Sequence, residues 1–130
     1  MRVEHIAIWT NDLERLKEFY VTYFDAQANQ KYINASKNFE SYFLSFPDGE
    51  CRIEIMKRPK LIKMDCNDEK NYIGLAHLAI SVGSKEKVID LTEKLRRDGY
   101  KVLSEARTTG DGYFESVIED PDGNRIEITI

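Results

Sequence analysis

Two histidines and two glutamates are the residues of this sequence best suited to chemistry. His5 and His77 are the only histidines in the chain, and each opens a short apolar run, His-Ile-Ala-Ile and His-Leu-Ala-Ile. Glu54 follows His5 by 49 residues (54 − 5), and Glu127 follows His77 by 50 (127 − 77). Two imidazoles and two carboxylates form a mixed nitrogen and oxygen ligand set, which suits a borderline divalent cation such as Zn²⁺, Ni²⁺, Co²⁺ or Mn²⁺. The remaining coordination positions would hold water or substrate.

The two His/Glu pairs belong to an internal repeat. Four segments recur in the same order: 5–8 at 77–80 (shift 72), Phe-Glu-Ser 39–41 at 114–116 (shift 75), Pro-Asp-Gly 47–49 at 121–123 (shift 74), and Arg-Ile-Glu-Ile 52–55 at 125–128 (shift 73). The shift changes only between matched segments, where loops absorb short insertions. We therefore divide the chain into a first module, 1–56, a linker, 57–72, and a second module, 73–130.

Each module is predicted to fold as a strand, a helix and further strands. In the first module, Asp12 closes an N-cap cluster before a helical pattern that begins at Leu13; in the second, Ser84 caps a helix that ends before Gly99. The Pro-Asp-Gly segments are predicted turns. The expected strands are 3–9, 30–33, 39–46 and 50–56 in the first module, and one around 75–82, then 101–104, 112–119 and 125–130, in the second.

Alternation along these strands places all four residues on the sheet faces that point away from the core. Side chains two residues apart share a face, so His5 and Glu54 lie opposite the isoleucines of their strands, and His77 and Glu127 do the same. The apolar faces are expected to pack under the helices. A solvated sheet face carries His and Glu routinely, but the duplicated arrangement favours a metal site over this simpler interpretation.

Composition excludes several classes of function. The 130 residues match one ordinary domain, and the net charge of −4 offers no general attraction to nucleic acid or to an anionic membrane. The charged start of the chain is unlike a secretory signal, and no run approaches the roughly 20 apolar residues of a membrane span. Cys51 and Cys66 form neither a CxxC pair nor a disulfide framework. We expect a cytoplasmic protein with free thiols.

From its first His-Ile-Ala-Ile to the closing segment Glu-Asp-Pro-Asp-Gly-Asn-Arg-Ile-Glu at 119–127, the chain resembles the vicinal oxygen chelate superfamily. This superfamily includes glyoxalase I, bleomycin and fosfomycin resistance proteins, methylmalonyl-CoA epimerase and extradiol dioxygenases. The resemblance implies an α+β fold of two paired βαβββ modules, which form an open, cup-shaped mixed sheet with the helices outside. It also implies a homodimer that acts on a small-molecule substrate.

Within this superfamily, the full His, Glu, His, Glu set is most similar to that of bacterial glyoxalase I. The resemblance carries the ligand roles to His5, Glu54, His77 and Glu127, around one divalent ion per site: Ni²⁺ or Zn²⁺ first, with Co²⁺, Mn²⁺ or Fe²⁺ as alternatives. It implies lactoylglutathione lyase-like chemistry on an α-oxo or hemithioacetal substrate through a metal-stabilised enediolate. Glu127 is the expected general base and Glu54 the expected partner that returns the proton, although the two could exchange roles.

The sequence departs from the glyoxalase I pattern at two positions. Members of that family usually carry an arginine four residues after the first ligand and an asparagine four residues after the second, both serving glutathione. Here these positions hold Trp9 and Arg58, which argues against glutathione as the thiol. The expected substrate pocket comprises Trp9, Arg58, Tyr42, Tyr113 and Arg125.

Two other interpretations stay open. One is a different enzyme of the superfamily, an epimerase or a dioxygenase. The other is a metal-free protein that binds a drug or metabolite, and retention of all four ligands argues against it.

Overall fold

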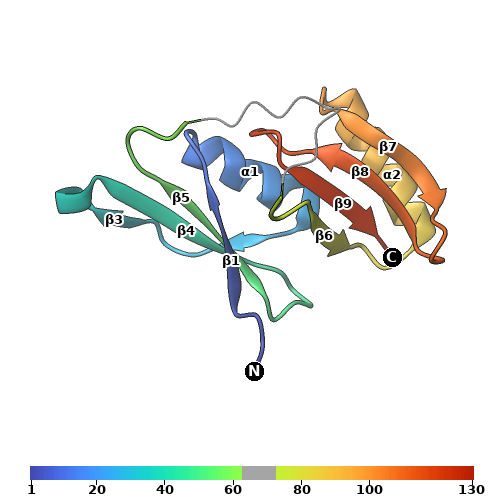
Figure 1. Cartoon of the computed structure of the whole chain (residues 1–130), viewed down its shortest axis with the longest axis horizontal. Coiled ribbons are helices and arrows are strands. Elements are labelled where there is room, and N and C mark those ends of the chain that lie inside the picture. The colour runs from blue at the N-terminus through green and yellow to red at the C-terminus, as the bar shows by residue number, and fades with distance from the viewer. Residues whose placement is uncertain (63–72) are drawn as a thin grey trace. The chain divides into compact units, whose positions relative to one another are not determined.

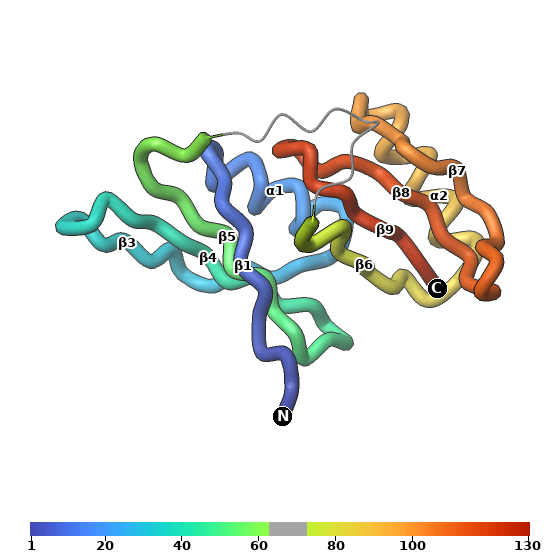
Figure 2. Tube along the Cα trace, viewed as in Figure 1, coloured from blue at the N-terminus to red at the C-terminus, as the bar shows by residue number. Residues whose placement is uncertain are grey.

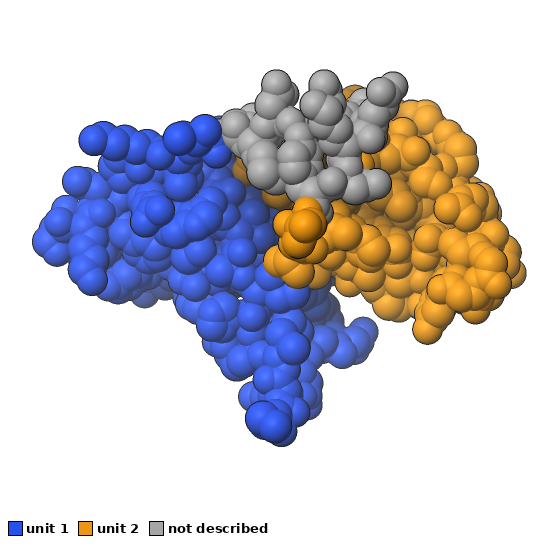
Figure 3. All heavy atoms as spheres, in the orientation of Figure 1, with its two compact units in different colours: residues 1–64 blue, residues 65–130 orange. Residues whose placement is uncertain are grey.

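The computed structural model describes residues 1–62 and 73–130 and divides the chain into two compact units, Met1–Met64 and Asp65–Ile130 (Figures 1 and 3). Residues 63–72 of the linker expected at 57–72 lie outside the described residues. No helix in the described part of the chain is both long and apolar enough to cross a membrane.

Unit 1 holds one helix and a five-stranded mixed sheet. Its elements are β1 (His5–Trp9), α1 (Leu13–Phe24), β2 (Gln27–Ala28), β3 (Tyr32–Asn34), the short 3₁₀ helix η1 (Ala35–Lys37), β4 (Phe39–Ser45) and β5 (Arg52–Lys57). The strand order is β1-β5-β4-β2, and β3 also pairs with β4. β1 runs parallel to β5, and the other pairings are antiparallel (Figure 2).

The single strand expected at 30–33 is instead the two short strands β2 and β3. Asn29 lies at the break. Its backbone N–H donates to Phe43 O (3.0 Å), while its side-chain Oδ1 accepts from Phe43 N (2.8 Å). Because a side chain takes the place of a backbone carbonyl there, the regular pairing with β4 stops and resumes at Tyr32.

Unit 2 repeats the arrangement. Its elements are β6 (Leu78–Ser81), α2 (Lys85–Arg97), β7 (Val102–Thr108), β8 (Phe114–Glu119) and β9 (Arg125–Thr129), in the strand order β6-β9-β8-β7. β6 is parallel to β9, and the other pairs are antiparallel. β7 is longer than the strand expected at 101–104. Its pairing with β8 shifts in register between Val102 and Arg107. The open mixed sheets and the single helix of each unit confirm the α+β fold and its βαβββ modules.

The two helices begin where their caps predict. Asp12 accepts a hydrogen bond from Arg15 N (3.1 Å) and Ser84 accepts one from Lys87 N (3.3 Å), each satisfying a backbone N–H of a first turn. Gly99, with φ 90°, takes the left-handed conformation just after α2.

Each helix packs on the isoleucine face of its own sheet. α1 contacts β4 and β5, and α2 contacts β7, β8 and β9. Ile53, Ile55, Ile126 and Ile128 are at most 3% exposed. The other face of each sheet, which carries the His and Glu side chains, therefore points away from the helix of its unit.

Candidate metal centre

The first His/Glu pair lies on β1 and β5 of unit 1. Their parallel register places Ala7 opposite Glu54 and His5 opposite Arg52, so His5 and Glu54 are diagonal neighbours on one face. The distance from His5 Nε2 to Glu54 Oε2 is 3.9 Å. The Glu54 side chain is 17% exposed, and that of His5 is 39% exposed. A parallel ladder thus brings together two residues that are 49 positions apart in sequence.

The second pair has the same geometry in unit 2. His77 directly precedes β6, in which Ala79 lies opposite Glu127. The distance from His77 Nε2 to Glu127 Oε2 is 3.4 Å, and the Glu127 side chain is again 17% exposed. Both glutamates are sheltered, and both imidazoles reach solvent.

These separations fit ligation of one ion by each pair. Zinc lies about 2.0–2.2 Å from imidazole nitrogen and carboxylate oxygen, so two such donors in a tetrahedral or octahedral site are about 3.0–3.4 Å apart. The His77–Glu127 pair meets this separation as it stands, and the His5–Glu54 pair exceeds it by about half an ångström. In the described part of the chain, no three His, Cys, Asp or Glu side chains gather closely enough to hold a metal. Each described unit therefore brings together one imidazole and one carboxylate.

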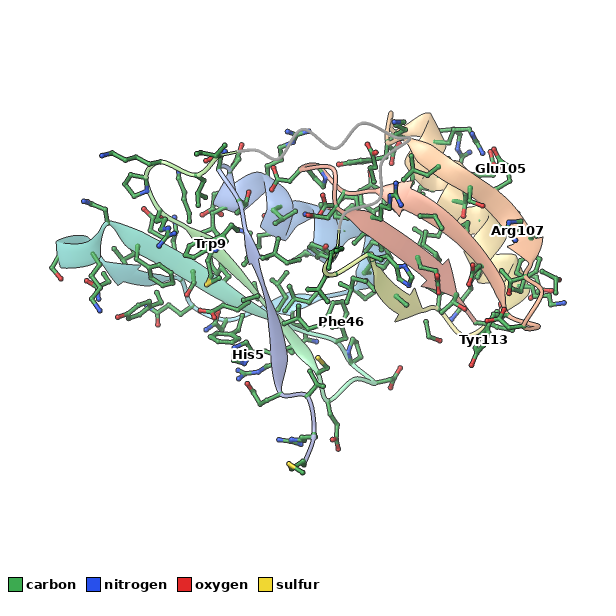
Figure 4. The ribbon with its side chains drawn as sticks, viewed as in Figure 1. His5, Trp9, Phe46, Glu105, Arg107 and Tyr113 are labelled. Carbon is green, nitrogen blue, oxygen red and sulfur yellow. The ribbon has the colours of Figure 1, made fainter. Side chains whose placement is uncertain are left out.

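The imidazole of His5 has further neighbours. Its Nδ1 hydrogen-bonds Glu4 Oε2, and Arg52 Nη2 donates to Glu4 Oε1. The hydrogen bonds from His5 and from Arg52 lower the pKa of the Glu4 carboxyl, so this group is a carboxylate at neutral pH. Figure 4 shows His5 projecting from β1.

Glu115 is a carboxylate of the second site that sequence reasoning missed. It lies opposite Thr129 in the β8–β9 ladder, next to the Val117–Glu127 pair, so it shares the face of Glu127. Burial raises the pKa of Glu115, and the charge of Glu127 and a hydrogen bond with it raise this pKa further. Arg107 lies opposite Glu115 across β7 and β8, and its charge acts the other way. Alternation along β8 places Glu115 on the face of Val117, but only the β8–β9 ladder shows that Glu127 shares this face.

Tyr42, which we expected to line the pocket, lies on the helix face instead. It pairs with the buried Ile55 in the β4–β5 ladder, and its hydroxyl donates to Glu14 Oε1 of α1 (3.0 Å). The residue of β4 opposite Glu54 is Phe43.

The β4–β5 and β8–β9 ladders also show which residues of the two modules correspond. Phe43 lies opposite Glu54 as Val117 lies opposite Glu127, so β4 and β8 correspond with a shift of 74 (117 − 43). The recurrence of Phe-Glu-Ser with a shift of 75 is therefore not a structural equivalence. Under the shift of 74, Ser116 is the counterpart of Tyr42 (116 − 42), and both reach toward their helix.

Trp9 and Arg58 contact each other directly. The Arg58 guanidinium lies over the Trp9 ring, 4.5 Å from its centroid, and Phe39 meets that ring edge-on at 6.2 Å between centroids. Trp9 is 41% exposed and shares the face of His5, because it follows it by four residues along β1. The Arg58 cation and the Trp9 indole thus lie on the face of unit 1 that carries His5 and Glu54.

The remaining pocket candidates are in unit 2. Arg125 opens β9 and shares the face of Glu127, two residues along the strand. Tyr113 is 57% exposed, in the turn before β8, where its carbonyl accepts from Thr109 N (2.8 Å) (Figure 4).

Comparison with known proteins identifies the family of this chain. The model of one family, Glyoxalase/Bleomycin resistance protein/Dioxygenase superfamily, matches residues 2–128, nearly the whole chain. The chain belongs to this superfamily. The family is named for two kinds of enzyme and one kind of resistance protein, so membership sets the scaffold and leaves the reaction to the site.

Individual relatives are distant. The Bacillus subtilis (strain 168) protein named "Uncharacterized protein YqjT" is 27% identical over 129 residues, which cover 97% of this chain and 96% of that protein. The glyoxylase/bleomycin resistance protein/dioxygenase domain from Frankia sp. EAN1pec superimposes with a TM-score of 0.81 at 18% identity, covering 100% and 97% of the two chains.

Glyoxalase I from Zea mays superimposes with a TM-score of 0.76 at 23% identity, covering 98% of this chain but 44% of the maize chain. This superfamily member thus spans less than half the length of the maize enzyme. At these identities, the superpositions show a shared fold.

Proposed function

We propose that this protein is a metal-dependent lyase or isomerase of glyoxalase I type, acting on a small α-oxo or hemithioacetal substrate. The observation that carries the proposal is the duplicated His/Glu pair, with donor atoms 3.9 Å apart in unit 1 and 3.4 Å apart in unit 2. A solvated sheet face requires no such pairing of imidazole with carboxylate, and no repetition of it. The superfamily supplies a scaffold on which such chemistry occurs.

His5, Glu54, His77 and Glu127 are the proposed ligands of one divalent ion, with Ni²⁺ or Zn²⁺ as the first choices. The ion would polarise adjacent substrate oxygens as a Lewis acid. We propose that the protein is a cytoplasmic homodimer. Modular duplication lets equivalent halves meet either within one chain or across two, so both arrangements of the site stay open.

Glu127 is the proposed general base. Its carboxylate is sheltered, at 17% exposure, and it lies beside the imidazole of His77. Such a carboxylate can take a proton from the substrate carbon next to the carbonyl. Glu54, its counterpart in the other unit, would return the proton, and the two glutamates could exchange roles.

The Trp9–Arg58 contact indicates where the rest of the substrate would lie. Four residues of extended strand separate His5 from Trp9, or about 13 Å. A guanidinium that lies over an indole ring keeps donors available for a carboxylate or phosphate. The proposed substrate therefore carries an anionic group at the end remote from the reacting carbon. This arrangement differs from the glutathione pattern of the glyoxalase I family.

Elemental analysis of protein purified without a polyhistidine tag tests the proposal. We expect about one divalent ion per chain, lost in Glu127→Ala and in His77→Ala, and retained in Glu105→Ala, whose side chain is 70% exposed and paired with Arg96. Thioester formation and oxygen consumption are then followed with hemithioacetals of several thiols. Metal-free protein that stays metal-free when it is reloaded would refute the metalloenzyme, and oxygen consumption would indicate a dioxygenase instead.

A further inference from the structure

Glu4 lies directly beside His5, the first of the proposed metal ligands. It directly precedes β1, and its backbone carbonyl accepts from Arg52 N (3.1 Å), which extends the β1–β5 pairing by one residue. Its two carboxylate oxygens have separate partners: Oε2 contacts Nδ1 of His5, and Oε1 contacts Nη2 of Arg52. The Glu4 side chain is thus held at both oxygens by the residues that flank it.

His5 and Arg52 also both contact the ring of Phe43. The His5 ring meets the Phe43 ring edge-on, with 5.4 Å between centroids and 88° between planes. The Arg52 guanidinium lies over the same Phe43 ring, 4.2 Å from its centroid. Phe43 therefore limits rotation of His5 on one side, while Glu4 anchors its Nδ1.

These contacts determine which nitrogen of His5 is free. A neutral imidazole donates from one nitrogen and accepts at the other. A carboxylate can only accept, so the nitrogen facing Glu4 carries the hydrogen and Nε2 keeps its lone pair. Nε2 is the atom that faces Glu54, at 3.9 Å.

We propose that Glu4 is a positioning residue, which fixes the tautomer and orientation of His5 so that Nε2 is presented for metal binding. This inference rests on the ligand role of His5 in the proposed function. Carboxylates that hold the second nitrogen of a ligating histidine raise metal affinity in other proteins.

Unit 2 provides an internal contrast. The residue before His77 is Ala76, which has no side-chain acceptor. Among the described residues, Glu127 is the only ion-pair partner of His77. The inference therefore predicts an effect of Glu4 on one of the two histidines and none on the other.

The test uses the full chain with Glu4→Ala, Glu4→Gln and the matched control Glu50→Ala. Glu50 is also an N-terminal-unit carboxylate paired with an arginine, Arg2, at 3.2 Å, and its side chain is 80% exposed. Affinity for zinc alone is measured by competition with a chromophoric chelator. We expect zinc affinity to fall about 10–100-fold in Glu4→Ala, to fall less in Glu4→Gln, whose amide oxygen still accepts, and to stay unchanged in Glu50→Ala.

Nitrogen-15 correlation spectra of the two imidazoles in metal-free protein give a readout independent of metal. We expect His5 to carry its hydrogen on Nδ1 in the wild type and to lose this preference in Glu4→Ala, while the His77 signals stay in place. A His5 tautomer unchanged in Glu4→Ala would overturn the inference, as would unchanged zinc affinity. If wild-type protein binds neither zinc nor nickel, the proposed function fails, and the tautomer still decides whether Glu4 positions His5.

Discussion

Removing His5 from unit 1 is expected to abolish metal binding at the His77–Glu127 pair of unit 2. Each unit contributes only two donor atoms, with separations of 3.9 and 3.4 Å. If all four ligate one ion, the loss of any one of them weakens every remaining bond to it. The loss of a ligand should cost at least the upper end of the 10–100-fold effect of an outer-shell residue, or about 2.7 kcal/mol of binding free energy for 100-fold.

The assay is zinc stoichiometry and affinity for His5→Ala, His77→Ala and the double variant, with Glu105→Ala as control. We expect both single variants to lose zinc at concentrations that saturate the wild type, and the double variant to lose little more. Independent half-sites predict another pattern, in which each single variant retains the zinc ion of the other unit at unchanged affinity and only the double variant loses both ions. That pattern would refute a shared site.

Three further predictions concern the scaffold. Thr92→Val should destabilise the fold by about 1–3 kcal/mol in urea unfolding, since it leaves the buried Ser116 hydroxyl without the partner it contacts at 2.6 Å; a double variant with Ser116→Ala should recover most of the loss. Glu14 has a pKa lowered from 4.5 to about 2, chiefly by its hydrogen bond from a lysine of its own helix, so its stabilisation is present above pH 4.5 and is lost as the pH falls toward 2; Glu14→Gln should flatten unfolding stability over that range, and a curve parallel to the wild type would contradict this. Asp120→Ala should destabilise by about 1.5–3 kcal/mol, because the buried carboxylate accepts from two backbone N–H groups and one side-chain amide of the turn before β9; equal thermal unfolding of variant and wild type would disprove it.

Features encoded by neighbouring residues could be predicted well. Asp12 and Ser84 cap the helices that the sequence indicates, and the isoleucines of the last strands are buried as alternation requires. The His and Glu side chains lie opposite those isoleucines, as expected. These predictions succeeded because capping and alternation depend on a few consecutive residues.

Features that depend on pairing between distant strands could not be predicted in the same way. The placement of Tyr42 in the pocket failed because the sequence does not show which face of β4 this residue occupies. The β4–β5 ladder decides it, and a one-residue shift in pairing turns a side chain to the other face. Glu115 was missed for the same reason, since only the β8–β9 ladder shows that it neighbours Glu127.

The sequence by itself determined the repeat, the modules it implies and the four residues with the capacity to bind a metal. Only the tertiary structure decided that each histidine meets its own module's glutamate, and that Glu4, itself paired with Arg52, contacts Nδ1 of His5. The reason is physical: periodicity is a property of contiguous residues, whereas a distance between atoms 49 or 50 positions apart is set by the register of hydrogen bonds between parallel strands.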